Sequence, residues 1–181
     1  MGKVAVSFGR YNYFNKGQFE TIRTILEKYD KLVLGVVNPD KEGAEEVEKF
    51  KEKYRDFYDT CDLKVLEVPL KYNDKKVIIE KSLRSLGVYN VEVVEVKRVE
   101  YFPSIFNKTF PKDRYDLVFP ILKTKFDIVR NDAFEEILER EVIKVVPKFE
   151  SHNSDSKNIR DNIVYYDEEI IQIYKRSGIE I

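Results

Sequence analysis

Residues 7–22, SFGRYNYFNKGQFETI, decide the fold that we expect for this chain. A short apolar run at residues 4–8 leads into this segment, and its continuous hydrophobic character is typical of a strand buried in a parallel sheet. Apolar residues then recur at helical spacing from Phe19 to Tyr29. The segment therefore predicts a buried strand, a polar loop and an amphipathic helix.

The same alternation of strand and helix continues along the chain. Further strands are predicted at residues 32–37, 63–68, 91–96, 115–119 and 142–146, the 91–96 strand near an edge because glutamates interrupt it. Helices are predicted at residues 44–57, 77–87 and 134–139, and an ordered but irregular connection at 101–114. Such alternation implies a parallel sheet covered on both faces. We expect one α/β domain over residues 1–181, with a doubly wound, mostly parallel, Rossmann-like sheet.

The composition is that of a soluble globular protein with a heavily charged surface, because 43% of residues are hydrophobic and 36% are charged. The 32 Lys and Arg residues balance 33 Asp and Glu residues, so the basic excess usual in nucleic-acid binders is absent. No apolar run suits a membrane span or a secretion signal, which favours a cytoplasmic location. Abundant Lys and Glu with one Cys and one Met hint at a thermophilic source.

Few residues offer metal-binding or nucleophilic chemistry. The chain has one cysteine, Cys61, and one histidine, His152, so an internal disulfide and a usual zinc site are both excluded. Cys61 is interpreted as a small hydrophobic residue. His152 could add a phosphate ligand, although a lone loop histidine is more often solvated. Asp127 and Asp132 could reach a metal ion, but they are better interpreted as cap or turn residues.

The loop after the first strand is the first candidate site. Ligands of open parallel sheets bind beyond the carboxyl ends of the strands, where the strand order reverses. A helix that begins near Gly17 would present free N–H groups to this crevice, and Arg10 and Lys16 would add positive charge. These features favour an anion, most simply phosphate. The glycine spacing matches neither the dinucleotide fingerprint nor the Walker loop, and a loop without a ligand stays an alternative.

Residues 9–18 resemble the nucleotidyltransferase superfamily of adenylyl- and cytidylyltransferases, most closely the archaeal-type nicotinamide mononucleotide adenylyltransferases. The family pattern G-R-F-x-P-F-H-x-G-H is written here GRYNYFNKGQ. Asn15 and Gln18 therefore stand where the family has its two histidines, and Tyr13 stands where it has proline.

A second segment supports the same resemblance. Residues 154–160, SDSKNIR, are similar to the phosphate-binding motif ISSTxxR or SGTxIR, with one extra residue before the Ile-Arg pair. Residues 126–132 could form the Asn-rich turn that the family places before a short helix, and that turn contains Asn131. Both ends of the expected fold are thus represented.

The resemblance implies transfer of AMP or CMP from a nucleoside triphosphate to a small phosphorylated acceptor such as nicotinamide mononucleotide, with Mg²⁺ as cofactor and pyrophosphate as leaving group. No protein metal ligand is expected, and the balanced charge and the lack of a long apolar run argue against nucleic-acid and membrane partners. A homo-oligomer is left open. The implied catalytic residues are Asn15, Lys16, Gln18 and Arg160. The implied nucleotide- or phosphate-binding residues are Gly9, Arg10, Gly17, Asn131, Ser154 and Ser156.

The missing histidines leave three hypotheses. An amide donates N–H to phosphate as imidazole does, but it cannot carry a positive charge. The protein is therefore expected to be a transferase, a nucleotide-binding or regulatory protein that has lost catalysis, or an interaction protein whose crevice is vestigial. Ser154 and Ser156 are either phosphate ligands or caps of the helix that follows them, and Arg160 is either a phosphate clamp or an exposed surface arginine.

Overall fold

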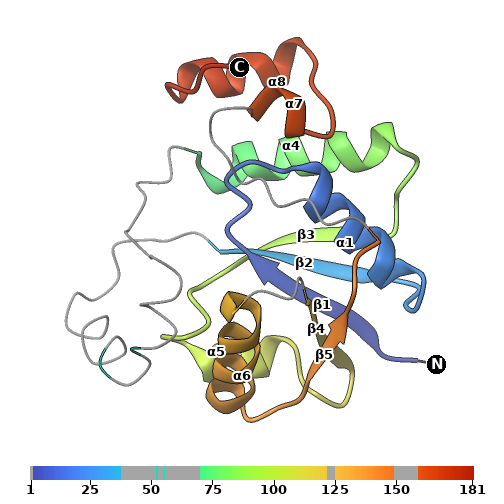
Figure 1. Cartoon of the computed structure of the whole chain (residues 1–181), viewed down its shortest axis with the longest axis vertical. Helices are drawn as coiled ribbons and strands as arrows, with labels where there is room; N and C mark the ends of the chain where they lie inside the picture. Colours follow the sequence, from blue (N-terminus) through green and yellow to red (C-terminus); the bar gives the residue numbers. More distant parts are fainter. Residues whose placement is uncertain (1, 38–51, 53–54, 56–69, 122–124, 149–158) are drawn as a thin grey trace.

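The computed structural model describes residues 2–37, 52, 55, 70–121, 125–148 and 159–181. In this part of the chain five parallel strands form one sheet in the order β3-β2-β1-β4-β5 (Figure 1). The strands are β1 (Val4–Gly9), β2 (Leu32–Val37), β3 (Val91–Val96), β4 (Tyr115–Pro120) and β5 (Val142–Val145). The predicted α/β class with a doubly wound parallel sheet is confirmed, and β3 is an edge strand of the described sheet, as predicted.

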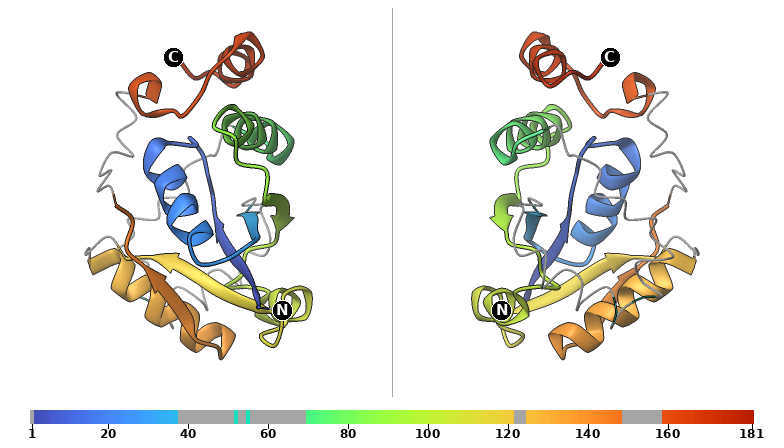
Figure 2. Two further views of the ribbon diagram at one scale, coloured as in Figure 1. Left: turned by 90° about the vertical axis from the view of Figure 1, so that its right-hand side faces the viewer. Right: turned by 90° about the vertical axis from the view of Figure 1, so that its left-hand side faces the viewer.

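Helices cover both faces of the sheet (Figure 2). One face is covered by α1 (Lys16–Leu26) and α4 (Tyr72–Ser85), and the other by α5 (Pro103–Thr109) and α6 (Lys125–Leu138). The short α7 (Ile159–Asn162) and α8 (Glu168–Arg176) follow β5 and lie beyond α1 and α4 (Figure 1). Three layers therefore enclose two hydrophobic cores, one on each side of the sheet.

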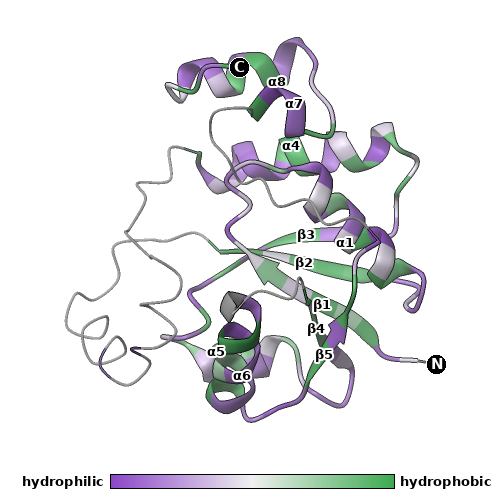
Figure 3. Ribbon diagram, in the orientation of Figure 1, coloured by the Kyte–Doolittle hydropathy of each residue, from purple (hydrophilic) through white to green (hydrophobic). Residues whose placement is uncertain are grey.

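Alternate residues of each strand supply the two cores, as the two-residue period of a strand requires. In β1, Ala5 faces the core shared with α1 and α4, whereas Val6 and Phe8 face the core shared with α5 and α6. In Figure 3 the strands are coloured mostly green, and the helices around them carry both green and purple segments. Because β1 is buried on both faces, its sequence reads as a continuous apolar run.

Two sequence predictions about the second half of the chain are wrong. The stretch predicted as irregular contains α5, because Phe102, Phe106 and Phe110 recur at the four-residue spacing of a helix and Pro103 occupies its first position, where proline is tolerated. Residues 126–132, predicted as a turn, lie inside α6, whose Asp127, Asn131 and Phe134 are buried together. The structure also adds α8, which was not predicted.

Other predictions fall outside the described residues, namely the strand at residues 63–68 and most of the helix at 44–57. Within the described residues, no helix has both the length and the apolar character that a membrane span requires.

Candidate functional site

A cavity lies where the strand order of the sheet reverses, between β1 and β4. It has a volume of about 150 Å³, and β1, α1, β4 and α6 all contribute to its wall. Its polar lining residues are Ser7, Tyr11, Gln18, Thr21 and Arg130. Because ligands of open α/β sheets bind at this reversal, the cavity marks the candidate site.

The first turn of α1 is closed by a reciprocal capping box. The Gln18 N–H donates to Asn15 Oδ1 at 2.9 Å, and the Asn15 N–H donates to Gln18 Oε1 at 3.1 Å. Asn15 and Gln18 therefore both use their amide oxygens to satisfy backbone N–H groups of the helix. Their NH₂ groups remain as donors, together with the N–H groups of Lys16 and Gly17 in the first turn.

Residues of the C-terminal part of the chain contact this helix terminus. The Lys16 Nζ donates to the Asp161 carbonyl at 2.9 Å, and Asn15 forms an antiparallel bridge with Ile163. Segments about 145 residues apart in sequence are thus in contact. Arg160 is exposed on α7, with its guanidinium 5.3 Å from the centre of the Tyr166 ring. The structure therefore places α7, which carries Arg160, beside the start of α1.

Lys75 holds the loop between β1 and α1. Its side chain is only 1% exposed, and its Nζ donates to the Arg10 carbonyl at 2.8 Å and to Asn12 Oδ1 at 3.2 Å. Burial, and secondarily the positive charge of Arg10, lower the pKa of Lys75 to about 8. A buried lysine is rare without such partners, so the two hydrogen bonds to the loop are what allow Lys75 to be buried.

Tyr11 shapes the side of the cavity next to β1. Its backbone is left-handed, with φ of 49°, and its ring lies over Gly9, where an added Cβ would approach Tyr11 Cε2 to 3.3 Å. Burial raises the pKa of its hydroxyl well above the ordinary value, while a hydrogen bond with Ser7 and the charge of Arg130 oppose this shift. Gly9 therefore makes room for an aromatic wall of the cavity.

The start of α6 forms the opposite wall. Arg130 Nη2 donates to the Pro120 carbonyl at 2.8 Å, and its Nε donates to Asn131 Oδ1 at 3.2 Å. Asp127, 1% exposed, forms an ion pair with Arg130 at 3.3 Å. Asn131 was predicted to bind nucleotide, but it is 2% exposed, and its oxygen accepts from Arg130, which itself lines the cavity. Asp127 is likewise committed to this arginine, and Asp132 is exposed.

Four residues considered in the sequence lie outside the described part of the chain. They are Cys61, His152, Ser154 and Ser156.

The described side chains include no ready metal centre. Among them, no group of three or more His, Cys, Asp or Glu residues could hold a metal ion.

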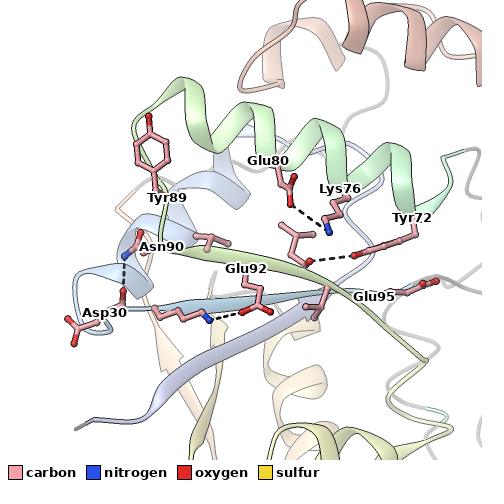
Figure 4. Close-up of a pocket in the computed structure, with 12 residues that line it drawn as sticks. Asp30, Tyr72, Lys76, Glu80, Tyr89, Asn90, Glu92 and Glu95 are labelled. Atoms are coloured by element: carbon pink, nitrogen blue, oxygen red, sulfur yellow. Dashed lines mark hydrogen bonds and ion pairs between the residues drawn. The ribbon is translucent and has the colours of Figure 1, made fainter.

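A second, wider hollow lies between α4 and the outer edge of β3 (Figure 4). Its volume is about 720 Å³, and none of the residues predicted to bind phosphate lines it. Both lysines that line it are paired with carboxylates, because Lys31 binds Glu92 at 2.6 Å and Lys76 lies 3.9 Å from Glu80. We therefore place the candidate site at β1 and β4, where distant segments converge, and not at this edge.

The sequence analysis missed three contributors to the site, Lys75, Arg130 and Tyr11. The signal for Lys75 was present, because it shares a helical stripe with the apolar residues Ile78 and Ile79. A lysine in that position is a candidate buried cation. A helix prediction over residues 126–132 would have indicated that Arg130 contributes to the wall of the site. The turn prediction for these residues prevented that inference.

No protein-family model matches this sequence, and no curated protein matches it either. Solved structures do match. Two structures of a bifunctional NMN adenylyltransferase/ADP ribose pyrophosphatase from Francisella tularensis, one in complex with AMP and a manganese ion, match with TM-scores of 0.61 and 0.63 at 14% identity. They cover 98% of this chain and 50% of their own, so the chain spans about half the length of that protein.

A protein from Vibrio parahaemolyticus, assigned as a nicotinate-nucleotide adenylyltransferase, also matches. Its TM-score is 0.57 at 15% identity, over 99% of this chain and 95% of its own. Identities this low establish a common architecture and no more. The chain therefore has the α/β fold of the nucleotide adenylyltransferases.

Proposed function

We propose that this chain is nucleotidyltransferase-like and binds the phosphates of a nucleoside triphosphate at the start of α1. The observation that carries this proposal is the convergence of the loop after β1 with α7, through Lys16 and Asp161 at the start of α1, whose Gln18 lines the β1–β4 cavity. The fold shared with adenylyltransferases supports it, and so does the AMP bound to the Francisella tularensis protein.

The proposed phosphate ligands are donors and cations from both segments. The N–H groups of Lys16 and Gly17 and the amides of Asn15 and Gln18 would donate to phosphate oxygens. Arg10, Lys16 and Arg160 would supply positive charge. Gly9, which has no side chain, would let the ligand approach beside Tyr11. Ser154 and Ser156 are proposed as further donors from the adjoining segment, and Arg130 replaces Asn131 as the proposed group at α6.

The proposed reaction is a direct displacement. A phosphate oxygen of a small acceptor, such as nicotinamide mononucleotide, forms a bond to the α-phosphorus, and the bond from that phosphorus to pyrophosphate breaks. The protein then needs no nucleophile, only alignment of two substrates and stabilisation of charge on phosphate oxygens. Mg²⁺ would enter with the triphosphate and neutralise its charge, since the described side chains provide no metal cluster.

A second candidate function is nucleotide binding without turnover. It is favoured by the capping box, because Asn15 and Gln18 are hydrogen-bonded to the helix and neither can become a cation. Losing one preorganised donor in a transferase typically raises the barrier by about 3 kcal/mol. Binding would then persist while transfer is slowed or lost.

A nucleotide screen separates these functions. We expect ATP or CTP with Mg²⁺ to raise the melting temperature, and pyrophosphate to form when a phosphorylated acceptor is present. Binding without pyrophosphate would favour the second function, and the double variant Asn15→His, Gln18→His should then regain some transfer. The absence of any nucleotide effect across the screen would reject both and leave an interaction role for this surface.

A further inference from the structure

The loop between β1 and α1 is held from outside by two helices that are distant in sequence. From α4, Lys75 donates to the Arg10 carbonyl and to Asn12 Oδ1. From α8, Tyr174 stacks against Tyr13, with ring centres 6.5 Å apart and 20° between the planes. The loop therefore does not owe its shape to its own residues alone.

Lys75 is buried, and burial of a charged side chain is energetically unfavourable unless the charge is hydrogen-bonded. Its side chain is 1% exposed and lies on the same stripe of α4 as Ile78 and Ile79, which are 2% and 0% exposed. An ammonium group in such a position must recover its lost hydration from hydrogen bonds. The two acceptors that compensate Lys75 both belong to the loop, so the free energy of burial is coupled to the loop conformation.

The position of the two acceptors connects this contact to the proposed site. Arg10 and Asn12 lie on either side of Tyr11, whose left-handed backbone sets its ring over Gly9 beside the cavity. Three residues beyond Asn12, Asn15 begins the first turn of α1. A shift of the loop at residues 10–12 would therefore move both the aromatic wall and the helix terminus.

We infer that Lys75 is a positioning residue, which fixes the loop of residues 10–15 and thereby the donors at the start of α1. This inference rests on the proposed function for its consequence, weaker binding of a triphosphate when the loop is released. Its structural part, the fixing of the loop by Lys75, can be measured without any nucleotide.

The matched control is the neighbouring Lys76. Lys76 belongs to the same helix, but it lines the hollow between α4 and β3 and lies 3.9 Å from Glu80 (Figure 4). Lys75→Met and Lys76→Met each remove one positive charge and leave an unbranched side chain that is one atom shorter than lysine. Lys75→Arg restores a cation that can donate to both loop acceptors.

Hydrogen exchange of the loop amides, measured far below the melting temperature, is the first readout. We expect Lys75→Met to speed the exchange of residues 10–15 by at least roughly tenfold, because both hydrogen bonds from this charged donor to the loop are lost. Lys76→Met should exchange like the unaltered protein, and Lys75→Arg should recover part of the protection. Unchanged loop exchange in Lys75→Met would overturn the inference, whatever its melting temperature, because a purely structural role changes stability alone.

Calorimetric titration with ATP and Mg²⁺ is the second readout. Weaker ATP binding in Lys75→Met, but not in Lys76→Met, would support the link to the site. Faster loop exchange with unaltered ATP binding would overturn that link. Faster loop exchange in a protein that binds no triphosphate would confirm the positioning role and reject the proposed function.

A third variant covers the case in which Lys75→Met does not fold. Asn12→Ala removes one of the two acceptors from the loop and leaves the lysine in place. Faster exchange of residues 10–15 in Asn12→Ala would support the positioning role, and unchanged exchange would overturn it.

Discussion

Asn15 and Gln18 close the first turn of α1 through each other's backbone N–H groups. This arrangement gives the two residues a stabilising role at the start of the helix. Stability and the proposed phosphate binding are therefore separable at these positions, since the oxygen atoms cap the helix and the NH₂ groups are not used in the capping box.

Variants of the capping box test this separation. Asn15→Ala should lower the free energy of unfolding by about 1 kcal/mol, because the N-cap acceptor is lost. Gln18→Glu should keep or raise stability, since a carboxylate caps equally well and interacts favourably with the helix dipole. The same change should weaken triphosphate binding severalfold by repulsion. Denaturant titration and calorimetry measure the two effects, and equal losses in both variants would contradict the assignment.

The burial of Lys75 leads to a second prediction at the residue scale, which concerns how the free energy of unfolding depends on pH. Its pKa is about 8 in the folded protein and 10.5 as an ordinary lysine, so between these values the unfolded state binds more protons. Stability from this group therefore rises with pH over that window, by up to about 3 kcal/mol, and is constant below pH 8. The difference in unfolding free energy between the unaltered protein and Lys75→Met should follow this rise. A flat difference from pH 7 to 10.5 would contradict it.

At the scale of elements, α8 is fastened to α4 by charges. Lys81 binds Asp167 at 2.6 Å, and Arg176 binds Asp74 at 2.6 Å. Asp167 is also the N-cap of α8, because its Oδ1 accepts the Ile170 N–H at 2.9 Å. One carboxylate thus serves both the start of the helix and its docking.

Two substitutions at Asp167 separate these contributions. Asp167→Asn keeps a capping oxygen and loses the ion pair, so its effect on the melting temperature should be small and should vanish in high salt. Asp167→Ala loses the cap as well, and its larger effect should persist in salt. Thermal melts at low and high salt make the comparison. Equal melting temperatures of the two variants in both low and high salt would show that the cap contributes nothing and that the ion pair alone matters.

Elements with strong local signals were predictable, and residues in unusual environments were not. The strand β1 and helix α1 followed from an apolar run and an apolar stripe. The helix α5 was missed because prolines at 103 and 111 obscured the spacing of its phenylalanines. Lys75 was missed because a charged residue is normally assigned to the surface. The approach of α7 to α1 is a long-range contact, which only the family resemblance suggested.

For the whole molecule, the core on the α5 and α6 side depends on an aromatic cluster around Phe8. Its ring contacts those of Phe106, Phe119 and Phe134 edge-on, with centroids 4.8–5.2 Å apart. Phe8 belongs to the central strand β1, so the cluster joins the sheet to both helices of that face.

Phe8→Ala should lower the free energy of unfolding by about 3–5 kcal/mol, through lost burial and the cavity that remains. This is a large fraction of the stability of an ordinary domain. For a chain of this size the melting temperature should fall by roughly 10 °C. Phe8→Leu should cost clearly less, because most of the volume is kept. Similar losses in both variants would show that the packing around Phe8 relaxes freely.

The contacts of Asn15 with Ile163 and of Lys16 with Asp161 have a consequence for biosynthesis. One wall of the crevice emerges early from the ribosome, and the facing wall emerges more than a hundred residues later. The proposed nucleotide site is therefore incomplete in a nascent chain that already contains β1 and α1, and nucleotide-dependent protection from proteases should arise only once α7 has been translated.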